Sequence, residues 1–77
     1  MGQSEGSHLL DYDVDGNPIY EGWAIRTGAD TSESIWRIKR YTWVSGNMTE
    51  EALAHGNSLY DNEWDERVAS VTYLVAV

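Results

Sequence analysis

The segment Ile35–Val44, with the sequence IWRIKRYTWV, carries the clearest structural signal in the chain. Its β-branched and aromatic residues alternate with basic residues, which is the period-two pattern of a half-buried β-strand. The alternation predicts an apolar face and a basic, aromatic face, made of Trp36, Ile38 and Val44 against Arg37, Lys39, Tyr41 and Trp43. Ile35 and Arg40 interrupt the strict alternation, so the strand is expected to bend.

A hairpin is predicted directly after this strand, because residues 45–47 (SGN) have the composition of a short turn. The partner strand would then occupy residues 48–54. The same segment also contains helix formers, with Thr49 as a candidate N-cap and Gly56 as a candidate C-cap. A strand is favoured because six residues are too few for a stable helix without packing. Both assignments of residues 48–55 nevertheless stay open.

On the N-terminal side of the hairpin, residues 15–18 (DGNP) predict a turn and residues 19–25 (IYEGWAI) predict a strand. Gly22 is a candidate bulge within that strand. On the C-terminal side, residues 59–65 are expected to form a short helical turn or a loop. Residues 70–77 (SVTYLVAV) are predicted to form the final strand.

The predicted fold class is therefore all-β: a small antiparallel β-sheet or sandwich of about four strands with one irregular or short helical crossing segment. Residues 1–10 are expected to form a flexible N-terminal arm, and residues 11–77 a single small β domain. A sheet of this size is expected to leave at least one face or edge for a partner.

Composition limits how such a domain can be stabilised. The chain has 77 residues, a formal net charge of -8, four Trp, five Tyr and no Cys. At this size only about 60% of the surface of the unfolded chain is buried on folding. Disulfides and thiolate-metal sites are excluded, so contacts with partner chains, or a metal bound through oxygen ligands, remain.

Several classes of protein are not expected from this composition. No stretch approaches the ~20 apolar residues that span a bilayer, and the first residues lack the charged and apolar regions of a signal peptide. The chain is therefore expected to be made in a cytoplasm, without a membrane partner. Its acidic net charge makes nucleic acid an unlikely partner, since phosphate binding is largely electrostatic.

An acidic run is the candidate metal site. Asp11, Asp13 and Asp15 with Gly16 match the opening of an EF-hand loop, whose alternating carboxylates suit Ca²⁺. The twelfth position, however, is Gly22 instead of the bidentate Glu. A solvated acidic turn is therefore favoured, no metal or other cofactor is predicted, and a Ca²⁺-stabilised binding module is kept as an alternative function.

The sequence does not predict an enzyme. His8 and His55 fall in the predicted arm and a predicted turn, and no nucleophile is placed beside either of them. A chain this short also rarely encloses the ~300 Å³ pocket that a small-molecule substrate needs. No catalytic residue and no small-molecule substrate are therefore predicted.

Aromatic and basic residues are the candidate interaction residues. Nine large aromatic residues exceed what a 77-residue core can enclose, and Trp, Tyr and Arg dominate interface hot spots. The candidates are Trp23, Trp36, Arg37, Lys39, Arg40, Trp43, Trp64 and Arg67. Two other interpretations stay open: the basic strand as a solvated face that balances nearby acids, and Trp64 as an edge of the core. Arg67 is expected to pair with Asp65 or to stack on an aromatic ring.

A resemblance extends over residues 16–73. Residues 16–24 (GNPIYEGWA) and 28–40 (GADTSESIWRIKR), followed by GN at 46–47 and WDER at 64–67, resemble a family of short tailed-bacteriophage proteins. Those proteins share the order Y-x-G-x-A, G-x-x-T-S, W-x-I-[KR]-[KR], G-N and W-D-x-R. The chain departs from the family at residues 23–26 and 48–55.

The resemblance implies a phage-encoded, non-enzymatic structural protein that is located in the virion, with capsid decoration, the neck and the tail all open. The expected partners are other virion proteins, copies of the chain itself, or both. A small early regulatory or host-inhibitor protein, acidic enough to imitate nucleic acid, is a further alternative.

Overall fold

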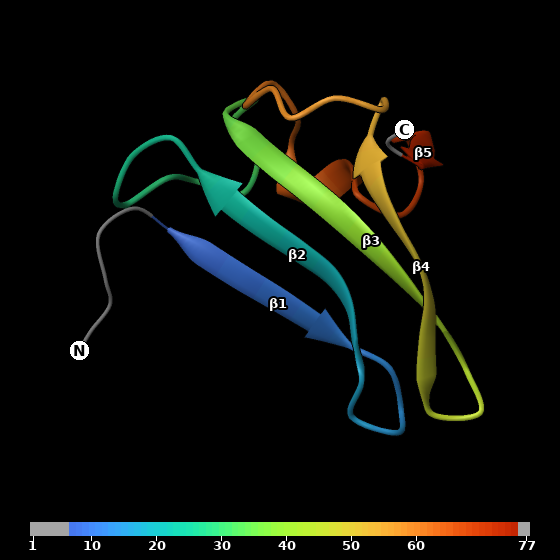
Figure 1. Cartoon of the computed structure of the whole chain (residues 1–77). Helices are drawn as coiled ribbons and strands as arrows, with labels where there is room; N and C mark the ends of the chain where they lie inside the picture. Colours follow the sequence, from blue (N-terminus) through green and yellow to red (C-terminus); the bar gives the residue numbers. More distant parts are fainter. Residues whose placement is uncertain (1–6, 76–77) are drawn as a thin grey trace.

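The computed structural model describes residues 7–75, which form one antiparallel sheet (Figure 1). Its strands follow the order β1-β2-β3-β4-β5, so every pair of neighbours is also consecutive in sequence. The elements are β1 (His8–Tyr12), β2 (Pro18–Ala24), β3 (Trp36–Val44), β4 (Asn47–Ala54), the 3₁₀ turn η1 (Trp64–Glu66) and β5 (Tyr73–Val75). The predicted all-β class is confirmed, as a single sheet of five strands.

The first and last strands differ from the expectation. Residues 8–10 belong to β1, so part of the segment predicted as a flexible arm pairs with β2. Polar residues are compatible with a strand at this position, because alternate side chains of an antiparallel strand can face solvent and only every second one faces the core. Residues 1–6 lie outside the described residues. At the other end β5 begins at Tyr73, later than predicted, because residues 70–72 are turn and coil; residues 76–77 lie outside the described residues.

The β3–β4 hairpin confirms the strand assignment for residues 48–54. Ser45 and Gly46 have φ angles of 51° and 80°, which are the paired positive values of a type I′ hairpin turn. Burial of Ala52 and Ala54 then selects a strand over a helix, because these alternate residues enter the core. The pairing of β3 with β4 shifts register between Thr42 and Trp43, with the extra residue on β4.

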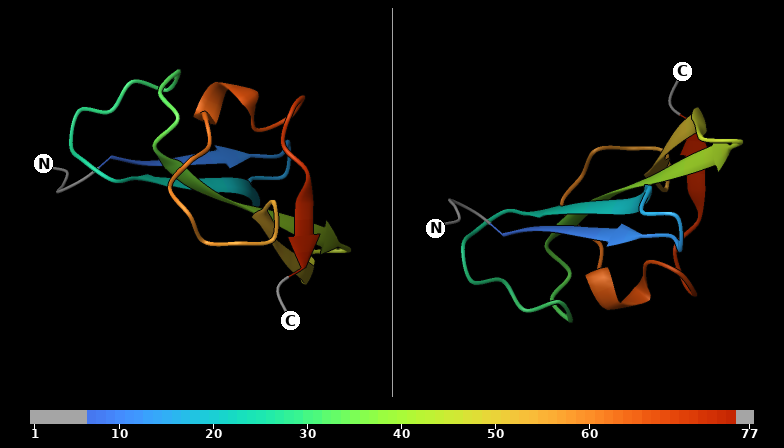
Figure 2. Two further views of the ribbon diagram at one scale, coloured as in Figure 1. Left: turned by 90° about the horizontal axis from the view of Figure 1, so that it is seen from above. Right: turned by 90° about the horizontal axis from the view of Figure 1, so that it is seen from below.

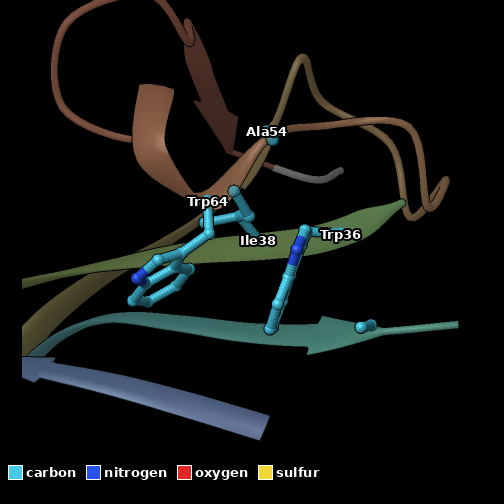
Figure 3. Close-up of a cluster of buried hydrophobic side chains, with 5 residues drawn as sticks. Trp36, Ile38, Ala54 and Trp64 are labelled. Carbon is cyan, nitrogen blue, oxygen red and sulfur yellow. The ribbon is translucent and has the colours of Figure 1, made fainter. Parts of the chain in front are cut away.

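The core lies against one face of the sheet. Trp36 and Ile38 of β3 are fully buried, and Ala24 and Ala54 fill the neighbouring positions of β2 and β4. The crossing segment between β4 and β5 carries η1 onto the same side, as both views in Figure 2 show. Trp64 from η1 thereby completes the cluster, with its ring centroid 5.9 Å from that of Trp36 (Figure 3).

Gly22 marks a close approach instead of the expected bulge. It pairs regularly with Leu9 on one side and Ile38 on the other, so the bulge prediction is wrong. A Cβ atom on Gly22 would lie 2.5 Å from Cε3 of Trp64 and 3.3 Å from Cε3 of Trp36. Figure 3 shows both indoles pointing toward β2. The absence of a side chain at this position is what lets the crossing segment reach the sheet.

Candidate protein-binding surface

The sheet face opposite the core gathers polar, aromatic and aliphatic side chains from all five strands. Strand alternation sends these residues away from Trp36 and Ile38. We call this surface the open face; it comprises His8, Leu10, Glu21, Trp23, Arg37, Lys39, Tyr41, Glu51, Leu53 and Leu74. Exposed fractions of 39% for Leu10 and 53% for Leu74 show that its aliphatic ends are accessible.

Trp23 lies at the centre of a row that runs across three strands. His8 of β1 stacks on it with ring centroids 5.5 Å apart and an interplanar angle of 25°. On the other side the Arg37 guanidinium lies 4.8 Å from the indole centroid. The strand register produces this row, because His8, Trp23 and Arg37 are direct neighbours in the β1–β2–β3 ladder.

Glu21 lies beside this row on the open face and contacts the side chains of His8 and Tyr41. Its Oε2 lies 2.7 Å from Nε2 of His8, and its Oε1 accepts a 2.5 Å hydrogen bond from the Tyr41 hydroxyl. Lys39 forms an ion pair with Glu51 beside this group. Burial, followed by the hydrogen bond and the charge of Glu21, raises the pKa of Tyr41 well above its ordinary value of 10.0. The phenol therefore stays protonated and donates to Glu21.

Arg37 differs from the other four cations of the chain. Arg26, Lys39, Arg40 and Arg67 each have a carboxylate oxygen within 4.0 Å. No such carboxylate contacts Arg37 among residues 7–75, and its buried Nε atom has no hydrogen-bond partner there. Its guanidinium is instead positioned by the Trp23 ring, which leaves the hydrogen-bonding capacity of a cation unused on the open face.

Trp43 stands at the far end of β3 from this row. Its Nε1 donates a 2.7 Å hydrogen bond to the carbonyl oxygen of Pro18, and its side chain is half-buried. This bond ties the C-terminal end of β3 to the start of β2. Trp43 is therefore held in place by the domain itself, while part of its ring surface stays accessible.

The remaining predicted interaction residues lie on the core side. Trp36 and Trp64 are core residues in the described structure, with exposed fractions of 0% and 6%, so neither offers surface to a partner. Arg40 stacks over Tyr73, with its Cζ 5.1 Å from the ring centroid. The interpretation of Trp64 as part of the core is the one that the structure supports.

Arg67 holds the crossing segment to the sheet. Its Nε and Nη2 donate to Oδ2 of Asp11 at 3.2 and 3.0 Å, and its Nη1 donates to the Trp64 carbonyl at 3.1 Å. The guanidinium also lies 4.5 Å from the Trp64 ring centroid. The predicted stacking is confirmed, whereas the acidic partner is Asp11 of β1 instead of Asp65.

The acidic run does not converge on one point. Asp11 faces the core side and pairs with Arg67. Asp13 caps the β1–β2 turn, because its Oδ1 accepts hydrogen bonds from the backbone N–H groups of Asp15 and Asn17, both at 2.9 Å. Within residues 7–75 no three acidic or histidine side chains cluster in a way that could hold a metal ion. The geometry accounts for the run as a structured turn.

The phenol groups of Tyr41 and Tyr73 are expected to make the domain less stable in alkaline solution. Burial is the main cause that raises the pKa of Tyr41 and of Tyr73 above 10.0 in the folded state. The unfolded chain therefore loses these protons first, and above a pH of about 10 the free energy of unfolding falls as the pH rises. Below that pH, both states keep the protons and the contribution to stability is complete.

Denaturant titrations between a pH of about 9 and 12 test this expectation. Tyr41→Phe and Tyr73→Phe should each flatten the alkaline fall by removing one late-titrating group. Tyr60→Phe, an exposed position in the crossing segment, serves as the control. An alkaline slope that is the same in all three variants would contradict the assignment.

The sequence-based site omitted several residues of the open face. His8, Glu21, Leu10, Leu53 and Leu74 become neighbours of the predicted residues only through the strand register. Alternation along β1 was the available signal, since His8 and Leu10 share the parity of one face. The prediction of a flexible arm for residues 1–10 leaves this alternation unused, and the other three residues lie on separate segments of the sequence.

Comparisons with known proteins do not extend this description. No protein-family model matches the sequence, and neither a curated protein nor a solved structure matches it. Within residues 7–75 no helix is long and apolar enough to cross a membrane. The same part of the chain forms no pocket.

Proposed function

We propose that this chain is a non-enzymatic structural module that binds other proteins through its open face, and that it serves as a component of a tailed-phage virion. The observation that carries the binding proposal is Arg37, positioned on Trp23 without a carboxylate partner among the described residues. The virion assignment rests on the resemblance of residues 16–73 to short phage proteins.

The chemistry of the open face suggests what its partner presents. An unpaired guanidinium over an indole is preorganised for a carboxylate, because the ring fixes the cation before binding and lowers the entropy lost on contact. Leu10 and Leu74 add exposed apolar surface toward the two edges. The complementary surface therefore carries an Asp or Glu side chain surrounded by apolar groups.

The net charge of -8 sharpens this proposal. A strongly acidic molecule repels most acidic surfaces. A cation of this chain can therefore bind an acidic group of a partner only where no carboxylate of the chain already pairs with that cation. Lys39 is neutralised by Glu51, whereas Arg37 is not. Arg37 thus supplies specificity for one docking orientation.

Quantitative mass spectrometry of gradient-purified particles tests the virion assignment. The wild-type chain should be present at a fixed ratio to the major capsid protein, and separated heads and tails would then distinguish capsid decoration from a neck or tail position. Absence from the particles would contradict the virion assignment and would favour an early regulatory protein.

Arg37→Gln tests the open face in the same particles. Loss of a charge-assisted hydrogen bond should reduce incorporation by about tenfold or more. Arg26→Gln is the matched control, because Arg26 lies in an exposed loop where it pairs with Glu33 at 2.5 Å. Thermal melts of both variants exclude loss of folding. Equal incorporation of the two variants would overturn the role of the open face.

A further inference from the structure

The outer edge of β1 has backbone N–H and C=O groups that find no partner among residues 7–75. Ala24 N–H donates to the Ser7 carbonyl at 2.9 Å, which makes residues 7 and 24 a hydrogen-bonded pair of the antiparallel ladder. Such pairs alternate, so Leu9 and Asp11 direct their backbone groups toward β2. The N–H and C=O groups of His8 and Leu10 consequently point away from the sheet.

This edge carries one device against pairing, the inward-facing charge of Asp11, which Arg67 already neutralises. Natural edge strands are commonly blunted by Lys, Pro or a bulge in the strand itself. The sequence of β1, HLLDY, contains neither Lys nor Pro, and the register shift near Tyr12 places its extra residue on β2. Figure 1 shows no other described element along the outer side of β1. The side chains of His8, Leu10 and Tyr12 are all exposed.

We propose that β1 pairs with β1 of a second copy of this chain, antiparallel and in register about Leu10, to form one continuous ten-stranded sheet. A two-fold axis through the Leu10 pair places Leu10 opposite Leu10 of the second copy. His8 then faces Tyr12, and Leu9 faces Asp11, in both directions.

The sequence of β1 is compatible with a second copy as the occupant, because this register places no two acidic side chains opposite each other. Like-charged association of two molecules with a net charge of -8 each requires a contact where acid does not meet acid. The only acidic residue of β1, Asp11, lies opposite Leu9 and is already neutralised by Arg67. The pairs on the open-face side, Leu10 with Leu10 and His8 with Tyr12, are aliphatic or aromatic, which are favourable cross-strand types.

This arrangement goes beyond the proposed function because it involves the backbone edge of β1, whereas partner binding involves side chains of the open face. Residues paired across an antiparallel ladder point to the same side of the sheet. Both open faces, each with its Trp23 and Arg37, therefore lie on one side of the joined sheet.

Amide hydrogen exchange of the full-length chain tests the pairing directly. The Leu10 amide should exchange more slowly as the protein concentration rises, whereas the Leu9 and Asp11 amides should be protected at every concentration. Where about nine-tenths of the chains are paired, exchange at Leu10 should slow by about tenfold, because only the remaining chains expose that group. Protection at Leu10 that is independent of concentration would overturn the proposal.

Two substitutions at one position separate the backbone contact from a general effect of residue 10. Leu10→Pro removes the outward N–H without taking a hydrogen bond from β2, and Leu10→Val keeps that N–H in a strand-forming residue. Both variants should fold by circular dichroism. Sedimentation equilibrium should then show a dimer for Leu10→Val and a monomer for Leu10→Pro. Equal association of the two variants would overturn β1 pairing.

The two proposals fail independently. Arg37→Gln should leave self-association unchanged, since Arg37 lies two strands away from the β1 edge. A wild-type chain that stays monomeric at millimolar concentration would overturn β1 pairing while leaving the open-face proposal intact. Self-association that is lost in Arg37→Gln would show that the copies meet through the open face, against the arrangement proposed here.

Discussion

Trp64→Ala is expected to lower the free energy of unfolding by about 3–5 kcal/mol, the usual loss for truncation of a large buried aromatic side chain. A domain of this length has a total stability of roughly 4 to 12 kcal/mol. The substitution therefore removes a large share of it. Trp64 is the residue of η1 that enters the core, and its ring also supports Arg67, so the packing of η1 against the sheet should loosen in the variant.

Urea denaturation followed by circular dichroism measures this effect, with Trp43→Ala as the matched control. Trp43 has the same side chain but is only half-buried and lies on the other face of β3. Its loss should cost about 1–2 kcal/mol, mainly through reduced burial and the hydrogen bond to Pro18. A Trp64→Ala variant no less stable than Trp43→Ala would contradict the place given to Trp64 in the core.

Gly22→Ala should destabilise the domain by about 1–3 kcal/mol, although Ala is otherwise the better residue in a strand. The added Cβ would stand 2.5 Å from Cε3 of Trp64, a distance at which the indole or the backbone must move. Because Trp64 itself packs against Trp36, the displacement would spread through the largest side chains of the core. Thermal denaturation should show a clearly lower midpoint.

A double-mutant cycle identifies the clash as the cause. In the Trp64→Ala background the space above Gly22 is vacant, so adding Gly22→Ala should cost little or increase stability. Where Trp64→Ala alone unfolds too far for measurement, Trp64→Leu provides the smaller side chain. An equal cost of Gly22→Ala in both backgrounds would mean that the glycine is needed for some reason other than the approach of Trp64.

The pattern of neighbouring residues is sufficient to predict the central β3–β4 hairpin. Alternation in Ile35–Val44 assigned Trp36 and Ile38 to one face and Arg37 to the other, as the structure has them. The SGN turn likewise predicted the tight connection to β4. These features depend on neighbouring residues and on the fixed period of a strand, and both can be read without knowledge of the rest of the chain.

The remaining features depend on residues far apart in sequence. Asp11 and Arg67 meet across 56 positions, whereas local sequence predicts the nearby Asp65 as the partner of Arg67. Local sequence predicts a bulge at Gly22 because the indole that requires the glycine belongs to the distant crossing segment. His8 joins Trp23 only through the β1–β2 register. Most of the candidate site therefore depends on the tertiary structure, since the periodicity of a strand shows which residues share a face but does not show their neighbours on the adjacent strands.

The sequential order of the strands also determines how the chain can fold. The β1–β2 and β3–β4 hairpins close short loops, whereas residues 25–35 separate β2 from β3. The crossing segment must then return over the sheet before Trp64 reaches β2. During synthesis the first four strands leave the ribosome before Trp64 and can pair while Trp36 and Ile38 are still uncovered. Docking of the crossing segment is then the step that covers the apolar face of the newly formed sheet. Before that step the chain is most exposed to proteases and chaperones.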